Sequence, residues 1–409
     1  MRTHRIRSIG IAALVALVGA GCAGMQGGGM SQTSHASHTI NMAAPTSAAE
    51  LRTALNALFA EHVYLAAAAT NAALGGRTAE FEAAAGALDA NSLDIAKAIG
   101  SVYGPDAEKA FLPLWRRHIG FVVDYTVGVA TNDKAKQDRS VSDLIGYTED
   151  FGAFLSSANP NLPKNVVADL VKHHILTLKE VIDAQAAKDT TRAWMAARTA
   201  AGHMQKIADP LADAIVKQFP NRFAGSPGGP AAGLRVAFNT ALREHAYLAA
   251  IATNAALGGR DAEFKAAAGA LDANSMDIAK AIGSVYGPGA EQAFLPLWRR
   301  HIGFFVDYTV GLATNDKAKQ DKAVSDLVGY TQDFGAFLNS ANPNLPKNVV
   351  ADLVKTHVLT LKDVVDAQAA KDQPKAWMAA RAAAAHMQMI ADPLAAAIAK
   401  QFPDKYASR

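Results

Sequence analysis

Histidines recur at a fixed interval along this chain of 409 residues. His62, His118 and His174 lie 56 residues apart, and each has a leucine four positions before it and an aliphatic or small residue four positions after it. Residues four apart lie on the same face of an α-helix, so each imidazole is expected on the inward, apolar face of its helix. The pattern predicts three buried imidazoles on three equivalent helices.

Three imidazoles that meet at one height could hold a transition-metal ion. Helices separated by one helical hairpin run parallel, so three hairpins in register would bring the histidines together. A set of three histidines with an open fourth position suits zinc, copper or iron, and His203 is a candidate for a fourth nitrogen. Haem bound by two histidines is an alternative ligand. The pattern recurs 183 residues later, which gives eight candidate metal ligands: His62, His118, His174, His203, His245, His301, His357 and His386.

The same histidines also admit a purely structural interpretation. A polar residue lies 29 positions after each of them, on the second helix of the expected hairpin. A buried histidine is tolerated when its ring nitrogens are hydrogen-bonded, and these residues are placed to supply the bonds. The protein would then be a structural or protein-interaction module. The partners are Asn91, Tyr147 and His203, with Asn274, Tyr330 and His386 in the second copy.

A catalytic site is the interpretation that the sequence supports least. Glu61 directly precedes His62 and so points about 100° away from it on a helix. The sequence contains no HExxH, GxSxG, P-loop or GxGxxG motif, and Cys22 is its one cysteine. A metal-dependent redox enzyme in a helical bundle is a third hypothesis, and non-catalytic binding is favoured over it.

The chain contains a tandem duplication. From Leu51 onward it repeats at an offset of 183 residues, so that Glu61–Arg77 returns as Glu244–Arg260. The segment Asn221–Gly233 between the copies is rich in glycine and proline, as interdomain linkers are. The expected organisation is a first domain over 47–220, a linker over 221–233 and a second domain over 234–403.

Apolar residues recur at intervals of three and four throughout each copy, which predicts helices. Ser47 and Glu50 form a capping-box pattern at the start of the first one. No segment shows the alternation of a strand. The sequence therefore predicts an all-α fold of two tandem six-helix bundles, each made of three antiparallel helical hairpins. The expected breaks in the first copy are Gly75-Gly76, Tyr103–Pro105, Asn132-Asp133, Asn159-Pro160 and Lys188-Asp189.

The N-terminus has the features of an export signal. Basic residues precede an apolar run that ends at Cys22, directly after small residues. This arrangement resembles a bacterial lipoprotein signal over 1–22, in which the cysteine thiol is acylated. Residues 23–46 have the composition of a flexible tether. We expect a lipid-anchored protein outside the cytoplasm, in the cell envelope, with the membrane as a partner through Cys22 and a further envelope protein as a candidate partner.

The charge balance argues against nucleic acid as a partner. The chain carries 40 Lys and Arg against 37 Asp and Glu, a formal charge of +3. Three of the basic residues, Arg2, Arg5 and Arg7, fall in the expected signal, so the chain without it is formally neutral (40 − 3 = 37). Nucleic-acid-binding domains usually carry a basic surface patch, for which this balance leaves little excess charge.

Several segments resemble a family of bacterial all-helical proteins with no established activity. They are NSLDIAKAIG, YTEDFGAFLSSANP, HMQKIADPLADAIVKQFP and the LWxxH helix, and together with their repeats they extend over most of each copy. Here the family pattern occurs as a tandem duplication behind a lipoprotein signal. The resemblance implies a helical fold and does not supply a function.

Overall fold

The computed structural model describes residues 47–407, and within this range the protein is all-helical, without a β-strand. The expected signal over 1–22, with Cys22, and the expected tether over 23–46 lie outside the described residues. None of the helices between residues 47 and 407 is long and apolar enough to cross a membrane.

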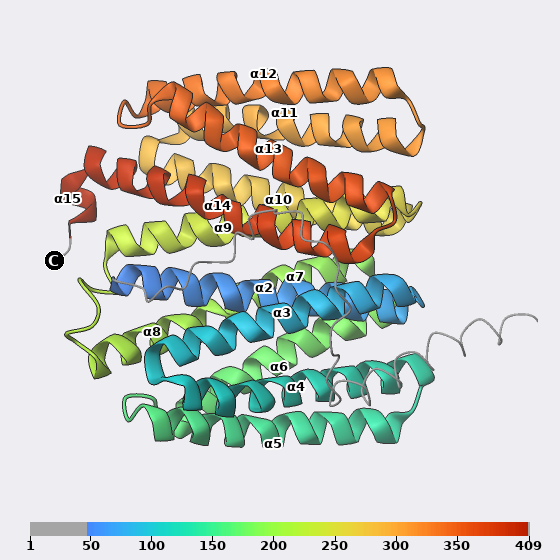
Figure 1. Ribbon diagram of the computed structural model, residues 1–409, viewed down its shortest axis with the longest axis vertical. Coiled ribbons are helices and arrows are strands. Elements are labelled where there is room, and N and C mark those ends of the chain that lie inside the picture. The colour runs from blue at the N-terminus through green and yellow to red at the C-terminus, as the bar shows by residue number, and fades with distance from the viewer. Residues whose placement is uncertain (1–46, 408–409) are drawn as a thin grey trace, which may run out of the picture.

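Each copy of the repeat forms a succession of long helices joined by short connections (Figure 1). The first copy comprises α2 (Ala48–Leu74), α3 (Thr78–Tyr103), α4 (Pro105–Thr131), α5 (Lys134–Ala158), α6 (Lys164–Ala186), α7 (Thr190–His203) and α8 (Gln205–Gln218). The second comprises α9 (Pro230–Leu257), α10 (Asp261–Tyr286), α11 (Pro288–Ala313), α12 (Lys317–Ala341), α13 (Lys347–Ala369), α14 (Gln373–Gln401) and the short α15 (Pro403–Tyr406).

The helices of the first copy are separated at the five breaks that the sequence predicts. Ser47 caps α2: its hydroxyl accepts from the backbone N–H of Glu50, and the Glu50 carboxylate accepts from the N–H of Ser47, which confirms the capping box. Gly104 separates α3 from α4 with a φ of 94°, a conformation that favours glycine. Asn132 ends α4 in the left-handed region, where asparagine is tolerated better than most residues.

Two boundaries differ from the expectation. The sixth helix of the first copy is interrupted at Met204, which divides it into α7 and α8, whereas its counterpart α14 is continuous. α9 begins at Pro230, inside the segment 221–233 expected as linker, because proline is favoured in the first turn of a helix. The connection between the copies is therefore shorter than the glycine and proline content suggests.

The three helices that carry the spaced histidines pack against one another. α2 contacts α4 and α6, and α4 contacts α6; in the second copy α9, α11 and α13 make the equivalent contacts. α2 is surrounded on all sides, since every residue from 55 to 70 is buried. A helix with alanine and leucine around its whole circumference can be buried in this way without enclosing many polar groups. The histidines thus lie on helices that meet inside the protein.

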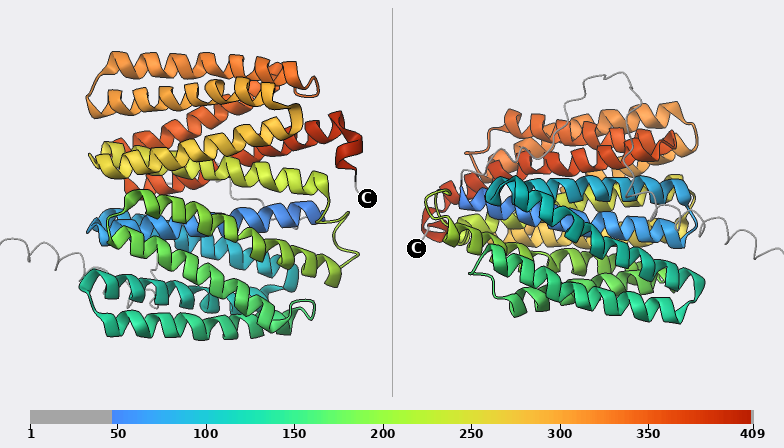
Figure 2. Two further views of the ribbon diagram at one scale, coloured as in Figure 1. Left: turned by 180° about the vertical axis from the view of Figure 1, so that it is seen from behind. Right: turned by 60° about the horizontal axis from the view of Figure 1, so that its bottom comes forward.

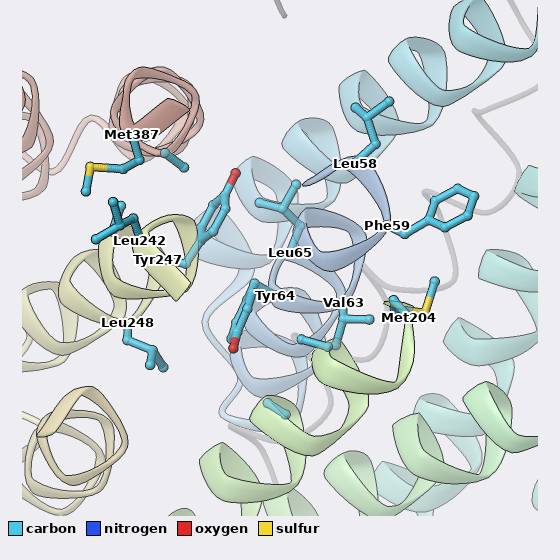
Figure 3. Packing of buried hydrophobic residues seen from close by; sticks show 14 of the residues in the cluster. Leu58, Phe59, Val63, Tyr64, Leu65, Met204, Leu242, Tyr247, Leu248 and Met387 are labelled. Atoms are coloured by element: carbon cyan, nitrogen blue, oxygen red, sulfur yellow. The ribbon is translucent and has the colours of Figure 1, made fainter. Parts of the chain in front are cut away.

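The two copies pack against each other through equivalent helices. α2 contacts α9, α3 contacts α14, and α7 contacts α10, so each contact has a counterpart with the copies exchanged (Figures 1 and 2). Tyr64 and Tyr247 stack where α2 meets α9, with ring centroids 5.7 Å apart (Figure 3). Most buried apolar residues belong to a cluster that extends through both copies, and Tyr308, Ala323 and Val365 form a small separate one. The copies therefore share a continuous core with a pseudo-two-fold relation between them.

Ion pairs link the copies around the stacked tyrosines. Arg198 of α7 pairs with Glu244 of α9 at 2.7 Å, and Glu244 also accepts from the Tyr64 hydroxyl at 2.6 Å. In the equivalent place Arg381 of α14 pairs with Glu61 of α2. Glu61 is the residue before His62, so the outward side of the histidine helix is fixed to the other copy.

Candidate metal centre

In the first copy the three spaced histidines converge on one point. His62, His118 and His174 come from α2, α4 and α6, and one ring nitrogen of each lies within 4.8 Å of the others. The Nε2 atoms of His62 and His118 are 3.4 Å apart. All three side chains are buried, with exposed fractions of 1%, 3% and 4%. We call these three residues triad 1.

The second copy reproduces the arrangement with independent residues. His245, His301 and His357 come from α9, α11 and α13, and their ring nitrogens also lie within 4.8 Å of one another. The Nε2 atoms of His245 and His301 are 3.3 Å apart. These residues form triad 2, which is buried to the same degree as triad 1.

Burial keeps the triad imidazoles neutral at physiological pH. The pKa of His118 is lowered to about 3 and that of His174 to about 4, in each case mainly by burial and to a smaller extent by a neighbouring imidazole. The pKa of His62 is lowered well below its usual range by burial and then by the other two rings. In triad 2 burial lowers the pKa of both His301 and His357 to about 3. A neutral imidazole has a free lone pair, which is the form that binds a metal.

The triad nitrogens are not satisfied by the hairpin partners that the structural interpretation requires. Neither ring nitrogen of His174 has a hydrogen-bond partner, and Nδ1 of His62 has none. Asn91 donates to the carbonyl of Leu58 at 3.0 Å instead of to His62. The hydroxyl of Tyr147 is buried without a partner, although its ring stacks on His118. Buried polar atoms are nearly always paired, so these nitrogens are unusual among the described residues.

His203 and His386, the candidates for a fourth nitrogen, lie outside the triads. Nε2 of His203 is 3.1 Å from the carbonyl oxygen of Leu170, and Nε2 of His386 is 3.0 Å from that of Leu353. Asn91 makes the equivalent contact with Leu58, in the position that corresponds to His203 in the internal repeat. In the first and third hairpins the polar residue of the second helix therefore contacts the backbone of the first helix, whereas the Tyr147 hydroxyl of the second hairpin has no partner. The structure consequently offers three histidines at each centre.

Aromatic side chains enclose one side of each triad. The ring of Trp115 lies 4.7 Å from that of His118 and 5.0 Å from that of His62, and it stacks on Phe111. Trp298 makes the equivalent contacts with His301 and His245. These tryptophans are buried core residues, and they keep water away from the histidines on this side.

A cavity approaches the other side of each triad. In the first copy it measures about 590 Å³, and in the second about 510 Å³. His62 and His118 line the first cavity, and Asp89 and Arg116 line it where side chains are exposed. The inner end is therefore formed by imidazoles and the outer end by an ion pair. The small residues of the first hairpin were a sequence signal for open volume, and Ala66, Ala69 and Ala85 among them line the first cavity.

The geometry of each triad suits a small metal ion. Nitrogens bound to zinc at about 2.0–2.1 Å in a tetrahedral arrangement lie about 3.3 Å from each other. Two of the three histidines in each triad agree with that value, since their Nε2 atoms are 3.4 Å and 3.3 Å apart, which exceeds the usual length of a hydrogen bond. A ring nitrogen of the third histidine lies within 4.8 Å of both. Each group consists of histidines alone, so its donor set is neutral. The two triads could therefore each hold a metal ion.

Comparisons of the chain with models of known protein families, with curated proteins and with solved structures found no match.

Proposed function

We propose that this protein is a non-catalytic metal-binding protein that holds one transition-metal ion in each triad. The observation that carries the proposal is the convergence of three buried imidazoles, twice in one chain, with Nδ1 of every one of them and Nε2 of His174 and His357 lacking a hydrogen-bond partner. Imidazole is a good ligand for zinc, copper and iron. The ligands are His62, His118 and His174 in the first copy and His245, His301 and His357 in the second.

The neutral donor set favours an ion of low charge. Neither triad contains a carboxylate, and the side chain of Glu61 is engaged by Arg381 on the other side of its helix. A dication would bring two uncompensated charges into apolar surroundings, which is costly unless an anion accompanies it. We therefore propose Cu(I) as the preferred ion and Zn²⁺ with a bound hydroxide as the second candidate.

Haem held by two histidines fits the triads less well than a bare ion. Two nitrogens on opposite sides of a metal would be about 4 Å apart, since each metal–nitrogen bond measures about 2.0 Å. The Nε2 atoms of His62 and His118 are closer than this, at 3.4 Å, and a third imidazole lies beside them. The arrangement favours three ligands on one side of an ion.

We further propose that the protein acts in the cell envelope. The signal-like segment 1–22 and its terminal Cys22 support a lipid anchor in the membrane, with residues 23–46 as the tether. The described helices would then form the exported part as two six-helix bundles, each of three helical hairpins around its own triad. The equivalent packing of α2, α4, α6 and of α9, α11, α13 supports this division.

Metal titration of the purified chain tests the proposal. The metal-free protein is incubated with Zn²⁺ or, under reducing anaerobic conditions, with Cu(I), and the metal retained after gel filtration is measured by mass spectrometry. We expect two ions per chain. Because each triad is independent, His118→Leu or His301→Leu alone should leave one ion, and the double variant should leave none.

A matched control removes a histidine that lies outside both triads. His173 is exposed, and Thr356 occupies the equivalent position in the second copy, so His173→Thr should retain both ions. Retention of two ions by the double variant would contradict the proposal. The free energy of unfolding of the metal-free chain distinguishes metal binding from a purely structural role of the histidines. We expect His118→Leu to leave it unchanged or raise it by about 1 kcal/mol, because a buried unpaired nitrogen is removed. A marked loss would favour the structural role.

A further inference from the structure

We propose that each cavity beside a triad binds a small, uncharged, largely aliphatic molecule with one polar end. This inference goes beyond metal binding and does not depend on it. The cavity volumes of about 590 Å³ and 510 Å³ lie within the usual range for sites of small molecules. Two such sites would be present in each chain, one in each copy.

Between the imidazoles at its inner end and the charged groups of Asp89, Arg116 and Arg117 at its outer end, the walls of the first cavity offer no free polar group. Most lining residues are alanines and larger aliphatic side chains. Thr70 donates its hydroxyl to Gln185 at 2.8 Å, and Thr126 donates to the carbonyl of Val122. Their hydrogen-bonding capacity is therefore used within the fold. The middle of the cavity suits a hydrocarbon body and excludes a charged one.

The inner end of the first cavity supplies its polar contact points, because His62 and His118 line it and Nδ1 of each has no hydrogen-bond partner. His62 lines the cavity, has an exposed fraction of 1%, and keeps Nδ1 without a hydrogen-bond partner. His245 has the same role in the second copy, with Nδ1 again unpartnered. A neutral imidazole can both donate and accept a hydrogen bond, so a hydroxyl group is a suitable partner. The ligand would thus enter with its hydroxyl toward the triad.

One substitution distinguishes the two cavities. At every position that lines both of them the copies carry the same residue, except that Val122 in the first is Phe305 in the second. Both side chains are buried. The larger phenylalanine occupies space that valine leaves open, and the second cavity is the smaller one. We infer that this position sets the maximum length of the ligand, which is greater in the first copy.

The test uses the metal-free full-length chain and a series of primary alcohols from butanol to decanol, measured by ligand-observed NMR. Ala252→Phe fills the second cavity and leaves the first, whereas Ala69→Phe leaves the second; both alanines line their cavities. Affinity should rise about fourfold for each methylene group until the cavity is full. The rise should stop at a shorter alcohol in Ala69→Phe than in Ala252→Phe.

Exchange of the distinguishing residue provides the matched variants. Val122→Phe in the Ala252→Phe background should shorten the limiting alcohol, and Phe305→Val in the Ala69→Phe background should lengthen it. Each introduces the residue that the other copy already accommodates, and cooperative thermal unfolding verifies the fold. Heptane and hexanol have similar sizes, so His62→Leu in the Ala252→Phe background should weaken binding of hexanol and leave that of heptane unchanged.

The outcomes separate this inference from the proposed function. Absence of saturable alcohol binding to the folded wild-type chain would overturn the inference and leave the metal titration untouched. The same limiting alcohol in both cavities, or no shift on exchange of Val122 and Phe305, would overturn the role of that position. Alcohol binding in a chain that takes up no metal would support the cavities and contradict the metal sites.

Discussion

In the triad histidines, Nδ1 of every ring is buried without the hydrogen-bond partner that a folded chain usually supplies. Neither nitrogen of His174 or of His357 is hydrogen-bonded. Each unsatisfied buried polar group costs about 1–3 kcal/mol, and the same cost recurs in both copies. An apolar residue at these positions would avoid it. This cost is the residue-level argument for a ligand, because a metal ion would engage the same lone pairs.

The first prediction concerns the pH dependence of stability in the metal-free chain. Burial lowers the pKa of His118 to about 3 in the fold, whereas a histidine in the unfolded chain titrates near 6.5. The unfolded chain therefore takes up protons that the folded chain does not, and the free energy of unfolding falls as the pH decreases below about 6.5. Each triad histidine contributes up to about 1.4 kcal/mol per pH unit. Chemical denaturation at a series of pH values between about 7 and 4 measures this dependence.

The control for this prediction is His118→Leu, which removes one of the contributing groups. Its free energy of unfolding should decline less steeply over the same range. If the free energy of unfolding depended on pH equally steeply in the wild-type chain and in His118→Leu, the fold would not hold His118 neutral.

At the scale of the elements, the two copies differ most visibly in their sixth helix. α7 ends at His203 and α8 starts at Gln205, whereas α14 runs without interruption. The sequence offers a local reason, since Gly202 in the first copy corresponds to Ala385 in the second. Glycine is the weakest helix former apart from proline because it loses the most backbone freedom on folding. The interruption lies beside His203 and does not disturb triad 1.

The second prediction is that Gly202→Ala stabilises the protein by about 0.5–1 kcal/mol. Gly202 is exposed, and a Cβ added there would meet no atom within 4 Å, so the alanine requires no rearrangement. The reverse change, Ala385→Gly, should destabilise the chain by a similar amount. Both values follow from the free energy of unfolding in denaturant. A loss of stability in Gly202→Ala would show that the fold requires the interruption.

At the scale of the whole molecule, the contact between the copies has the form of a symmetric dimer within one chain. α2 meets α9, and the pairs α3 with α14 and α7 with α10 exchange under the same relation. Tyr64 and Tyr247 stack near the centre of this contact. The helices α2 and α9, which carry His62 and His245, lie in the middle of this contact. Each therefore contributes to a triad and also packs against the other copy. The duplication thus places two equivalent histidine triads in one set of packed helices.

The third prediction concerns the charged groups at this contact. Arg381 of α14 pairs with Glu61 of α2 and also with Asp94 of α3, at 2.7 Å for Asp94. The Glu61 side chain is only 5% exposed, and Arg381 forms an ion pair with it, while the buried Arg243 interacts with Glu61 electrostatically. Arg381→Met should reduce the free energy of unfolding by about 3 kcal/mol, because the buried Glu61 carboxylate loses its ion pair. Denaturant titration provides the measurement.

Two further variants serve as controls for Arg381→Met. Lys97→Met removes a lysine that is 62% exposed next to Asp94, and it should change the stability by less than about 1 kcal/mol. Adding Glu61→Gln to Arg381→Met should recover part of the loss, since the unpaired charge is then absent. If Arg381→Met were as stable as the wild-type chain, the contact between the copies would not depend on this pair.

The sequence by itself determined the local features of this protein. Helix boundaries depend on residues within a few positions, such as the Ser47–Glu50 capping box and the turn at Gly104, and the structure confirms both. The all-helical class and the inward orientation of the spaced histidines likewise follow from periodicity along a single helix. The interruption at Met204 also has a local cause in the neighbouring Gly202, but a single glycine inside a helix is too weak a signal to predict a break.

Only the tertiary structure decided which groups meet. Asn91 and Tyr147 lie on the helices that follow those of His62 and His118, at positions from which the sequence suggested a hydrogen bond to the rings. In the packed structure neither residue makes that bond. His203 contacts the backbone carbonyl of Leu170, and Glu61 pairs with Arg381 of the other copy, 320 residues away in the sequence. The cavities arise because alanines on several helices leave a space that no single helix reveals. These features depend on how helices are offset and rotated against one another, and that information is not carried by the spacing of residues along the chain.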